Sequence, residues 1–153
     1  MSTDPRFESY DPTRATAMVG GSAASTGIPA YLGIRIDAVG PGTMTASIEV
    51  REEHLNPFGS AHGGTLAALV DHVLGGVLYS VIPPHSWAAT TEFKLNFLAP
   101  VRVGTLSAAA TIESMTRRTA VVRIQATNDG RLVGLAQGTV TIQAPRVEPP
   151  AAP

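Results

Sequence analysis

One stretch decides the fold that the sequence predicts: residues 63–82, which read GGTLAALVDHVLGGVLYSVI. Apolar side chains recur in it at the i, i+3, i+4, i+7 spacing of one helix face, namely Leu66, Leu69, Val70, Val73, Val77 and Val81. Leu74 and Leu78 form a second apolar row beside the first. We therefore expect a long helix that is apolar around most of its circumference, and that other elements must wrap.

Period-2 alternation of apolar and polar residues predicts the strands that wrap this helix. It runs through four clear segments, 43–51, 106–112, 120–126 and 132–142. Another strand is marked by Phe93, Leu95 and Phe97. A weaker strand covers roughly residues 31–39, and Asn128-Asp129-Gly130 predicts a hairpin turn. Two strands, one helix and four strands predict a two-layer α+β domain with a curved antiparallel sheet, and argue against parallel βαβ folds.

Composition at both ends sets the expected domain boundaries. Residues 1–27 mix prolines and glycines with Ser, Thr and Ala without sustained periodicity, so we expect a flexible N-terminal segment. Residues 145–153, PRVEPPAAP, are too rich in proline for a regular element and predict a disordered tail. The remaining residues, 28–144, are enough for one domain with a core of its own.

Charge and cysteine content narrow the function classes. A formal net charge of -1 leaves no basic footprint and argues against nucleic acid as a partner. The absence of cysteine excludes disulfides, thiolate chemistry and Cys-type zinc sites, and the histidines show no metal-ligand spacing with carboxylates. Because the amino terminus is polar and Asp71 and His72 interrupt the longest apolar run, we expect a soluble cytoplasmic protein without a membrane span.

An aspartate stands in the middle of the apolar helix. Asp71 has Val70, Leu74 and Leu78 as helix neighbours, and there is almost no other charge in the run. It could be an ordinary helix carboxylate that finds water or a partner. A carboxylate partly removed from water is instead a competent base or nucleophile, which makes Asp71 the first candidate for chemistry.

The helix opens with His62, Gly63 and Gly64. These residues could simply cap the helix, with His62 bonded to local backbone. The functional alternative is that a carbonyl oxygen approaches the free N–H groups of the helix start, where no side chain is in the way, as in an oxyanion hole.

The spacing of these groups limits how they could act together. Gly63 and Asp71 are eight residues apart, about 12 Å along a helix. One reacting carbonyl cannot reach both groups on a single helix, whereas two antiparallel copies could each lend Gly63 to the other's Asp71. If both groups are catalytic, the site is shared across a two-fold dimer.

A set of residues with defined order and spacing combines these features: Asn56, Gly59, His62-Gly63-Gly64 and Leu69-Val70-Asp71, then an extended segment ending Phe97-Leu98-Ala99-Pro100. This set resembles the hotdog-fold thioesterases over about residues 28–144, most closely their phenylacetate-pathway (PaaI-like) branch. The resemblance implies a long central helix wrapped by the sheet. Another branch has glutamate at the aspartate position and threonine one turn later, where this chain has Asp71 and Gly75.

The resemblance also implies hydrolysis of acyl-coenzyme A thioesters without a metal or cofactor. By it, the Gly63 N–H polarises the thioester carbonyl, His62 holds the turn in shape, and Asn56 orients the thioester or the attacking water. Asp71 of the partner subunit is the base or nucleophile. Thr90 matches a hydroxyl residue that positions water or carboxylate, although strict alternation from Phe93 would turn Thr90 away unless the strand contains a bulge.

Substrate-binding residues are expected around this centre. Gly64 and Phe58 would adjoin the thioester and the acyl group, while Arg117 and Arg118 lie in a turn where the family meets the nucleotide or pantetheine; a solvated basic turn would explain the two arginines equally well. The resemblance implies a homodimer at least, and a homotetramer is common in the family. The alternatives left open are an acyl-CoA sensor that binds without turnover and a hotdog-fold hydratase or dehydratase.

Overall fold

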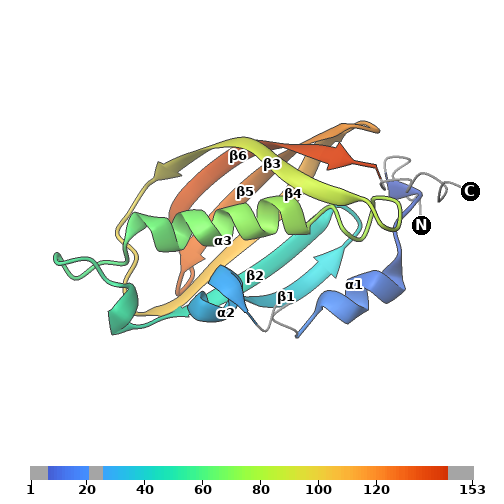
Figure 1. Ribbon diagram of the computed structural model, residues 1–153. Helices are drawn as coiled ribbons and strands as arrows, with labels where there is room; N and C mark the ends of the chain where they lie inside the picture. Colours follow the sequence, from blue (N-terminus) through green and yellow to red (C-terminus); the bar gives the residue numbers. More distant parts are fainter. Residues whose placement is uncertain (1–6, 21–25, 145–153) are drawn as a thin grey trace, which may run out of the picture.

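One helix held in a curved sheet forms the centre of the computed structural model, which describes residues 7–20 and 26–144 (Figure 1). The helix α3 (Gly63–Gly76) lies along the concave face of six antiparallel strands. In chain order the strands are β1 (Arg35–Gly40), β2 (Thr43–Val50), β3 (Trp87–Phe97), β4 (Gly104–Met115), β5 (Thr119–Asn128) and β6 (Arg131–Gln143). They pair in the order β1-β2-β4-β5-β6-β3. The predicted α+β hotdog fold is confirmed.

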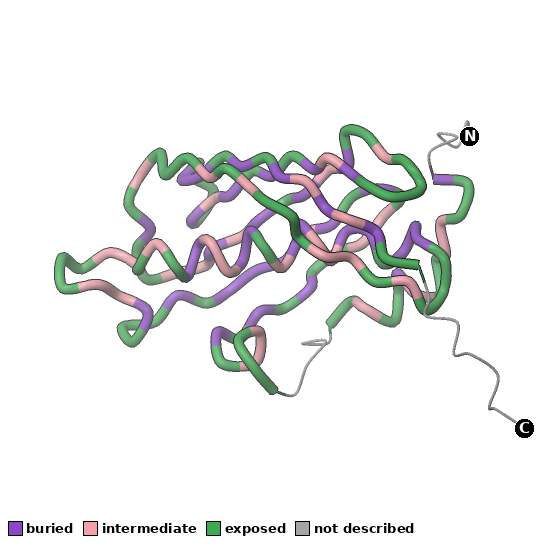
Figure 2. The backbone as a smooth tube through the Cα atoms, turned by 45° about the horizontal axis from the view of Figure 1, so that its top comes forward, coloured by how far each residue is buried: buried purple, intermediate pink, exposed green. Residues whose placement is uncertain are grey.

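The core lies between α3 and the sheet, and Figure 2 shows buried residues alternating with more exposed ones along the strands. Leu69, Val70, Val73 and Leu74 of the helix are 0% exposed. Helix side chains on this face meet alternate residues of β2, β4, β5 and β6, which are buried in the same cluster. The helix is wrapped because its apolar surface is too wide to be covered by one flat layer.

Two glycines of β6 let α3 lie close to the sheet. A Cβ on Gly134 would come within 3.1 Å of Leu66 Cδ2, and one on Gly138 within 2.9 Å of Leu74 Cδ2. The two leucines are separated by about 12 Å along a helix, and the two glycines by about 13 Å along a strand. The helix therefore runs alongside β6 with each leucine seated over a glycine.

Several boundaries differ from the expected ones. The helix ends at Gly76, and the predicted apolar row continues as buried turn residues to Val81. A short helix, α2 (Gly27–Leu32), occupies the first two residues of the weak strand and is capped by Gly33 with φ 67°, so the strand begins only at Arg35. The hairpin turn is confirmed, since Asp129 and Gly130 have φ of 47° and 81°.

The N-terminal segment, expected to be flexible from its composition, contains a helix, α1 (Pro12–Met18). The Asp11 carboxylate caps α1 by accepting hydrogen bonds from the N–H groups of Thr13 and Arg14, at 2.9 and 3.1 Å. Pro12 stands at the first helical position, where its missing N–H costs nothing. Phe7 is buried in the core cluster. The tail predicted over 145–153 lies outside the described residues.

Candidate functional site

A tight turn leads into α3, and its backbone is held by internal hydrogen bonds. The Asn56 side-chain oxygen accepts from Phe58 N at 2.9 Å, and its amide donates to Ser60 Oγ at 3.0 Å. At the far end of the turn, His62 N donates to the carbonyl oxygen of His54 at 2.8 Å. Asn56, predicted to orient the thioester or water, uses its side chain within the turn in this structure.

His54 fixes the backbone to which the end of the turn is hydrogen-bonded. It ends the short helix η2 (Glu52–His54) and is 4% exposed. Its ring Nδ1 accepts a hydrogen bond from Arg51 N at 3.2 Å, so the backbone that receives His62 N–H is itself fixed. This role of His54 was not predicted from the sequence, because it depends on contacts across the turn.

The start of α3 leaves one amide hydrogen free. His62 is the N-cap, and its ring Nδ1 accepts a hydrogen bond from Gly64 N at 3.0 Å. Thr65 N donates to the carbonyl oxygen of His62 at 2.9 Å. Among the described residues, no acceptor is bonded to Gly63 N. Of the two glycines, only Gly63 therefore offers a donor; the expected donor at Gly64 is already used by His62.

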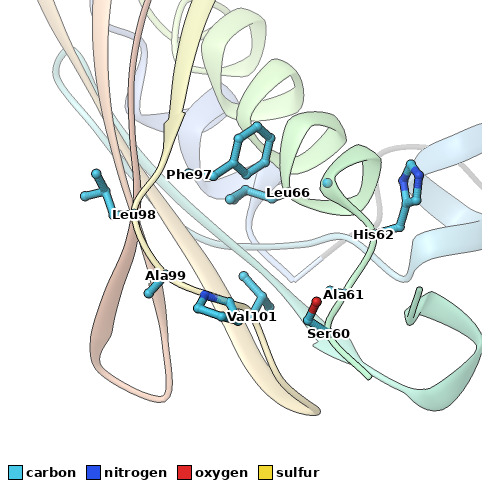
Figure 3. Close-up of a pocket in the computed structure, with 10 residues that line it drawn as sticks. Ser60, Ala61, His62, Leu66, Phe97, Leu98, Ala99 and Val101 are labelled. Carbon is cyan, nitrogen blue, oxygen red and sulfur yellow. The ribbon is translucent and has the colours of Figure 1, made fainter. Parts of the chain in front are cut away.

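A cavity of about 350 Å³ opens at this point (Figure 3). Besides the helix start, it is lined by Leu66 and by the segment that follows β3, including Phe97, Leu98 and Pro100. Phe97 lies beside Leu66 on one side of the helix start, and the His62 ring lies on the other (Figure 3). A Cβ on Gly63 would come within 3.3 Å of the Phe97 ring, which explains a glycine here by close approach. The result is a cavity whose lining is part polar and part apolar, beside a free N–H group.

A second cavity, of about 260 Å³, lies over the outer face of α3. It is lined by Met18, Ile36, Asp71, His72, Gly75, Gly76, Tyr79, Ala88 and Thr90. The bulge that Thr90 requires is present, because β3 shifts register between Thr90 and Glu92 against β6. Thr90 and Asp71 thus line one cavity.

Within one chain, Asp71 is exposed. The expectation that its helix neighbours remove it from water is wrong, since Val70 and Leu74 point at the sheet and Asp71 points away from it. His72, which lines the same cavity, is more enclosed: burial lowers the pKa of its ring, and the nearby Asp71 carboxylate opposes this shift only in part. Two adjacent helix residues can line one cavity even though their side chains diverge.

The two cavities share no lining residue, so one chain does not bring Gly63 and Asp71 together. Arg117 and Arg118 lie elsewhere again, in a hollow of about 540 Å³ with Pro83 and Ser86. Phe58 is 90% exposed and lines neither cavity, because its turn projects from the domain. Sequence reasoning missed Met18, which comes from the N-terminal helix that composition did not predict.

No three side chains of the His, Asp or Glu type gather to hold a metal ion in the part of the chain that the structure describes. Within the same residues, no helix has the length and apolar character needed to cross a membrane.

Comparisons with known proteins agree with this geometry. The family model described as Thioesterase superfamily matches residues 58–135, which include the turn, α3 and most of the sheet. A 1,4-dihydroxy-2-naphthoyl-CoA hydrolase of Listeria monocytogenes is 27% identical over 78% of this chain and 98% of its own length.

Solved structures that resemble this chain include a thioesterase and a PaaI protein. A mutant thioesterase from Pseudomonas aeruginosa superposes with a TM-score of 0.75 and 26% identity, over 87% of this chain and 94% of that one. The PaaI protein from the phenylacetic acid degradation operon of E. coli superposes with a TM-score of 0.71 and 27% identity, over 76% of this chain and 83% of that one. With the fold, the PaaI-like motif and the family match in agreement, the chain belongs to the thioesterase superfamily and is a hydrolase of thioesters.

Proposed function

We propose that this thioesterase hydrolyses acyl-coenzyme A at a site built from the Gly63 N–H of one subunit and Asp71 of its partner. The observation that carries the proposal is the free Gly63 N–H beside a cavity, eight residues from a carboxylate in a different cavity. The name of the Listeria hydrolase supports coenzyme A esters as the substrate class.

In this mechanism the thioester oxygen accepts a hydrogen bond from Gly63 N–H. The donor is fixed before the substrate arrives, so it stabilises the charge that develops on the oxygen during attack. His62 keeps the donor in place by occupying Gly64 N–H with its ring. Asn56 holds the preceding turn, which shapes the same cavity.

Asp71 completes the reaction from the opposite chain. In one route its carboxylate attacks the carbonyl carbon, the C–S bond breaks and the coenzyme A thiolate leaves, and water then hydrolyses the mixed anhydride to free acid and Asp71. In the other, it takes a proton from a water molecule that attacks the carbonyl carbon, and the C–S bond breaks to give free acid and the thiolate. Thr90, on the wall of the same cavity, would orient that water or the carboxylate. Phe58 would meet the substrate once a partner chain covers it, and Arg117 and Arg118 would contact the coenzyme phosphates.

The sheet offers a natural way to join two chains. β3 stands at one end of the strand order, with β6 as its only neighbouring strand in the described part of the chain. Its apolar residues Trp87 and Phe97 are exposed, and so is Leu98 just beyond it. A second copy of β3 could pair with this edge about a two-fold axis, which would extend the sheet and set the two α3 helices side by side. We propose a homodimer at least and a homotetramer built from it; a cytoplasmic location stays a prediction.

The test is release of coenzyme A thiol from short, long and aromatic acyl-CoA esters. Asp71→Asn keeps the size of the side chain and removes its charge, so we expect turnover to fall about a hundredfold or more. Asp37→Asn is the matched control, because Asp37 is an exposed carboxylate of β1 outside both cavities. Equal turnover in Asp71→Asn and native protein would refute the mechanism, and binding without hydrolysis on every ester would indicate a sensor.

A further inference from the structure

The cavity beside Asp71 is partly built by residues that the thioesterase family model does not cover. That model matches residues 58–135, whereas Met18 of α1 and Ile36 of β1 also line the cavity. α1 is held in place by the Asp11 cap and by a hydrogen bond of 2.9 Å from Arg14 Nη2 to the carbonyl oxygen of Ile82. Part of the cavity wall therefore comes from residues outside the matched region.

The space in the cavity exists because position 75 has no side chain. Gly75 comes one helical turn after Asp71, on the same face of α3. A Cβ placed on Gly75 would meet nothing within 4 Å, and Gly75 lines the cavity. A larger side chain there would extend into the space next to the Asp71 carboxylate. Gly76 differs, since its Cβ would come within 2.7 Å of Met44 Sδ.

The charges around the cavity suit an acyl group better than the coenzyme. None of the described residues that line it is Lys or Arg, and its one carboxylate is Asp71. The diphosphate of coenzyme A would be repelled there. The cavity at Gly63 differs in having no carboxylate among its described lining residues. It runs along the irregular backbone of residues 98–101, and the next residue, Arg102, uses its Nη1 to donate to the carbonyl oxygen of Gly59.

We propose that the cavity beside Asp71 receives the acyl group, and that Gly75 and Met18 set the largest acyl group that fits. This inference rests on the proposed function. A dry cavity of about 150 Å³ is enough for benzene, and this cavity measures about 260 Å³. It would take a substituted aromatic ring or a short chain, and a long fatty acyl chain would not fit.

The test compares kcat/KM for acetyl-, butyryl-, hexanoyl-, palmitoyl- and phenylacetyl-CoA. Each methylene that enters the cavity should raise kcat/KM about fourfold, until the cavity is full. In Gly75→Leu, the ratio of phenylacetyl-CoA to acetyl-CoA should fall at least about tenfold, because about four methylene-sized groups fill the space. In Met18→Ala, the optimum should move to a longer chain. Ala17→Leu, on the exposed side of α1, is the matched control and should leave the profile unchanged.

Folding should not obscure the result. Leucine is a far better helix former than glycine, so Gly75→Leu should melt no lower than the native protein. An active native enzyme whose chain-length profile is the same in Gly75→Leu and Met18→Ala overturns this inference alone. The inference is also overturned if Gly75→Leu loses kcat/KM equally on acetyl-CoA and phenylacetyl-CoA while the preferred chain length of Met18→Ala is unchanged. A native protein that hydrolyses none of the esters overturns the proposed function, and this inference with it.

Discussion

Replacing Gly63 with proline would remove the amide hydrogen that the start of α3 leaves free. Proline is tolerated at the first helical position, and it prefers an extended residue before it, which His62 already is with φ −59° and ψ 138°. The added Cβ would lie 3.3 Å from Phe97 Cζ, and Phe97 is exposed enough to move by a few tenths of an ångström. We therefore expect Gly63→Pro to fold and to lack only the donor.

The size of the effect follows from a matched pair. Gly63→Ala adds the same Cβ beside Phe97 but keeps the N–H group. The loss of one oxyanion donor costs about 10²–10³ in kcat. Gly63→Pro should fall below Gly63→Ala by that factor, measured as thiol release at saturating acyl-CoA. Equal kcat values for the two variants would refute an oxyanion role for Gly63 N–H.

Mixed dimers then test whether the site is shared. A dimer of one Gly63→Pro chain and one Asp71→Asn chain would have one site with both defects and one site with neither. Random exchange of equal amounts makes about half of the dimers mixed, so about a quarter of the native activity should return. Two affinity tags would isolate the mixed dimer. No recovery in that isolated dimer would mean that Gly63 and Asp71 of the same chain act together, or that one of them does not act.

Two further predictions concern stability and pH. Gly138→Ala should lower the free energy of unfolding by about 1–3 kcal/mol, because its Cβ would come 2.6 Å from the Glu92 carbonyl oxygen. Gly75→Ala, whose Cβ meets nothing within 4 Å, should raise the free energy of unfolding by about 0.5–1 kcal/mol. Denaturant titration that ranks the two variants in the other order would contradict the packing described. Burial lowers the pKa of His72, so the unfolded chain takes up this proton more readily, and stability should decline as pH falls below the ordinary value of 6.5. Thermal unfolding of His72→Gln should show a shallower decline over that range, and an identical decline would rule His72 out as its source.

Most of the fold could be predicted because four strand segments alternate apolar and polar residues, and residues 63–82 keep the apolar spacing of one helix face. The order of strands and helix follows from those patterns, and the Asp129-Gly130 turn follows from its need for positive φ. α1 was missed because Pro12 and the nearby glycines indicate irregular backbone when taken singly. Asp11 followed by Pro12 is a helix-start signal, which was the available clue.

The site was predicted less completely than the fold. Gly63 and Asp71 stand out as a free helix start and a charge in an apolar run. A bond from His62 to local backbone was one of the two interpretations of the helix start. That the ring takes Gly64 N–H and leaves Gly63 N–H free depends on one side-chain conformation. The exposure of Asp71 likewise depends on the direction of the helix over the sheet. Met18 carries no sequence signal for its position, since it reaches the cavity only through the packing of α1 on β1.

The bulge in β3 has a consequence for insertions and deletions. Thr90 pairs with Val140 and Glu92 with Thr139, so Thr91 is the one residue of this segment that has no partner of its own. Loss of Thr91 would leave every other side chain of β3 on its present face, with Thr90 still toward Asp71. Loss of one residue between Phe93 and Phe97 would instead turn the whole first half of the strand over. Chains of this kind that differ in length by one residue in β3 should therefore differ at the bulge.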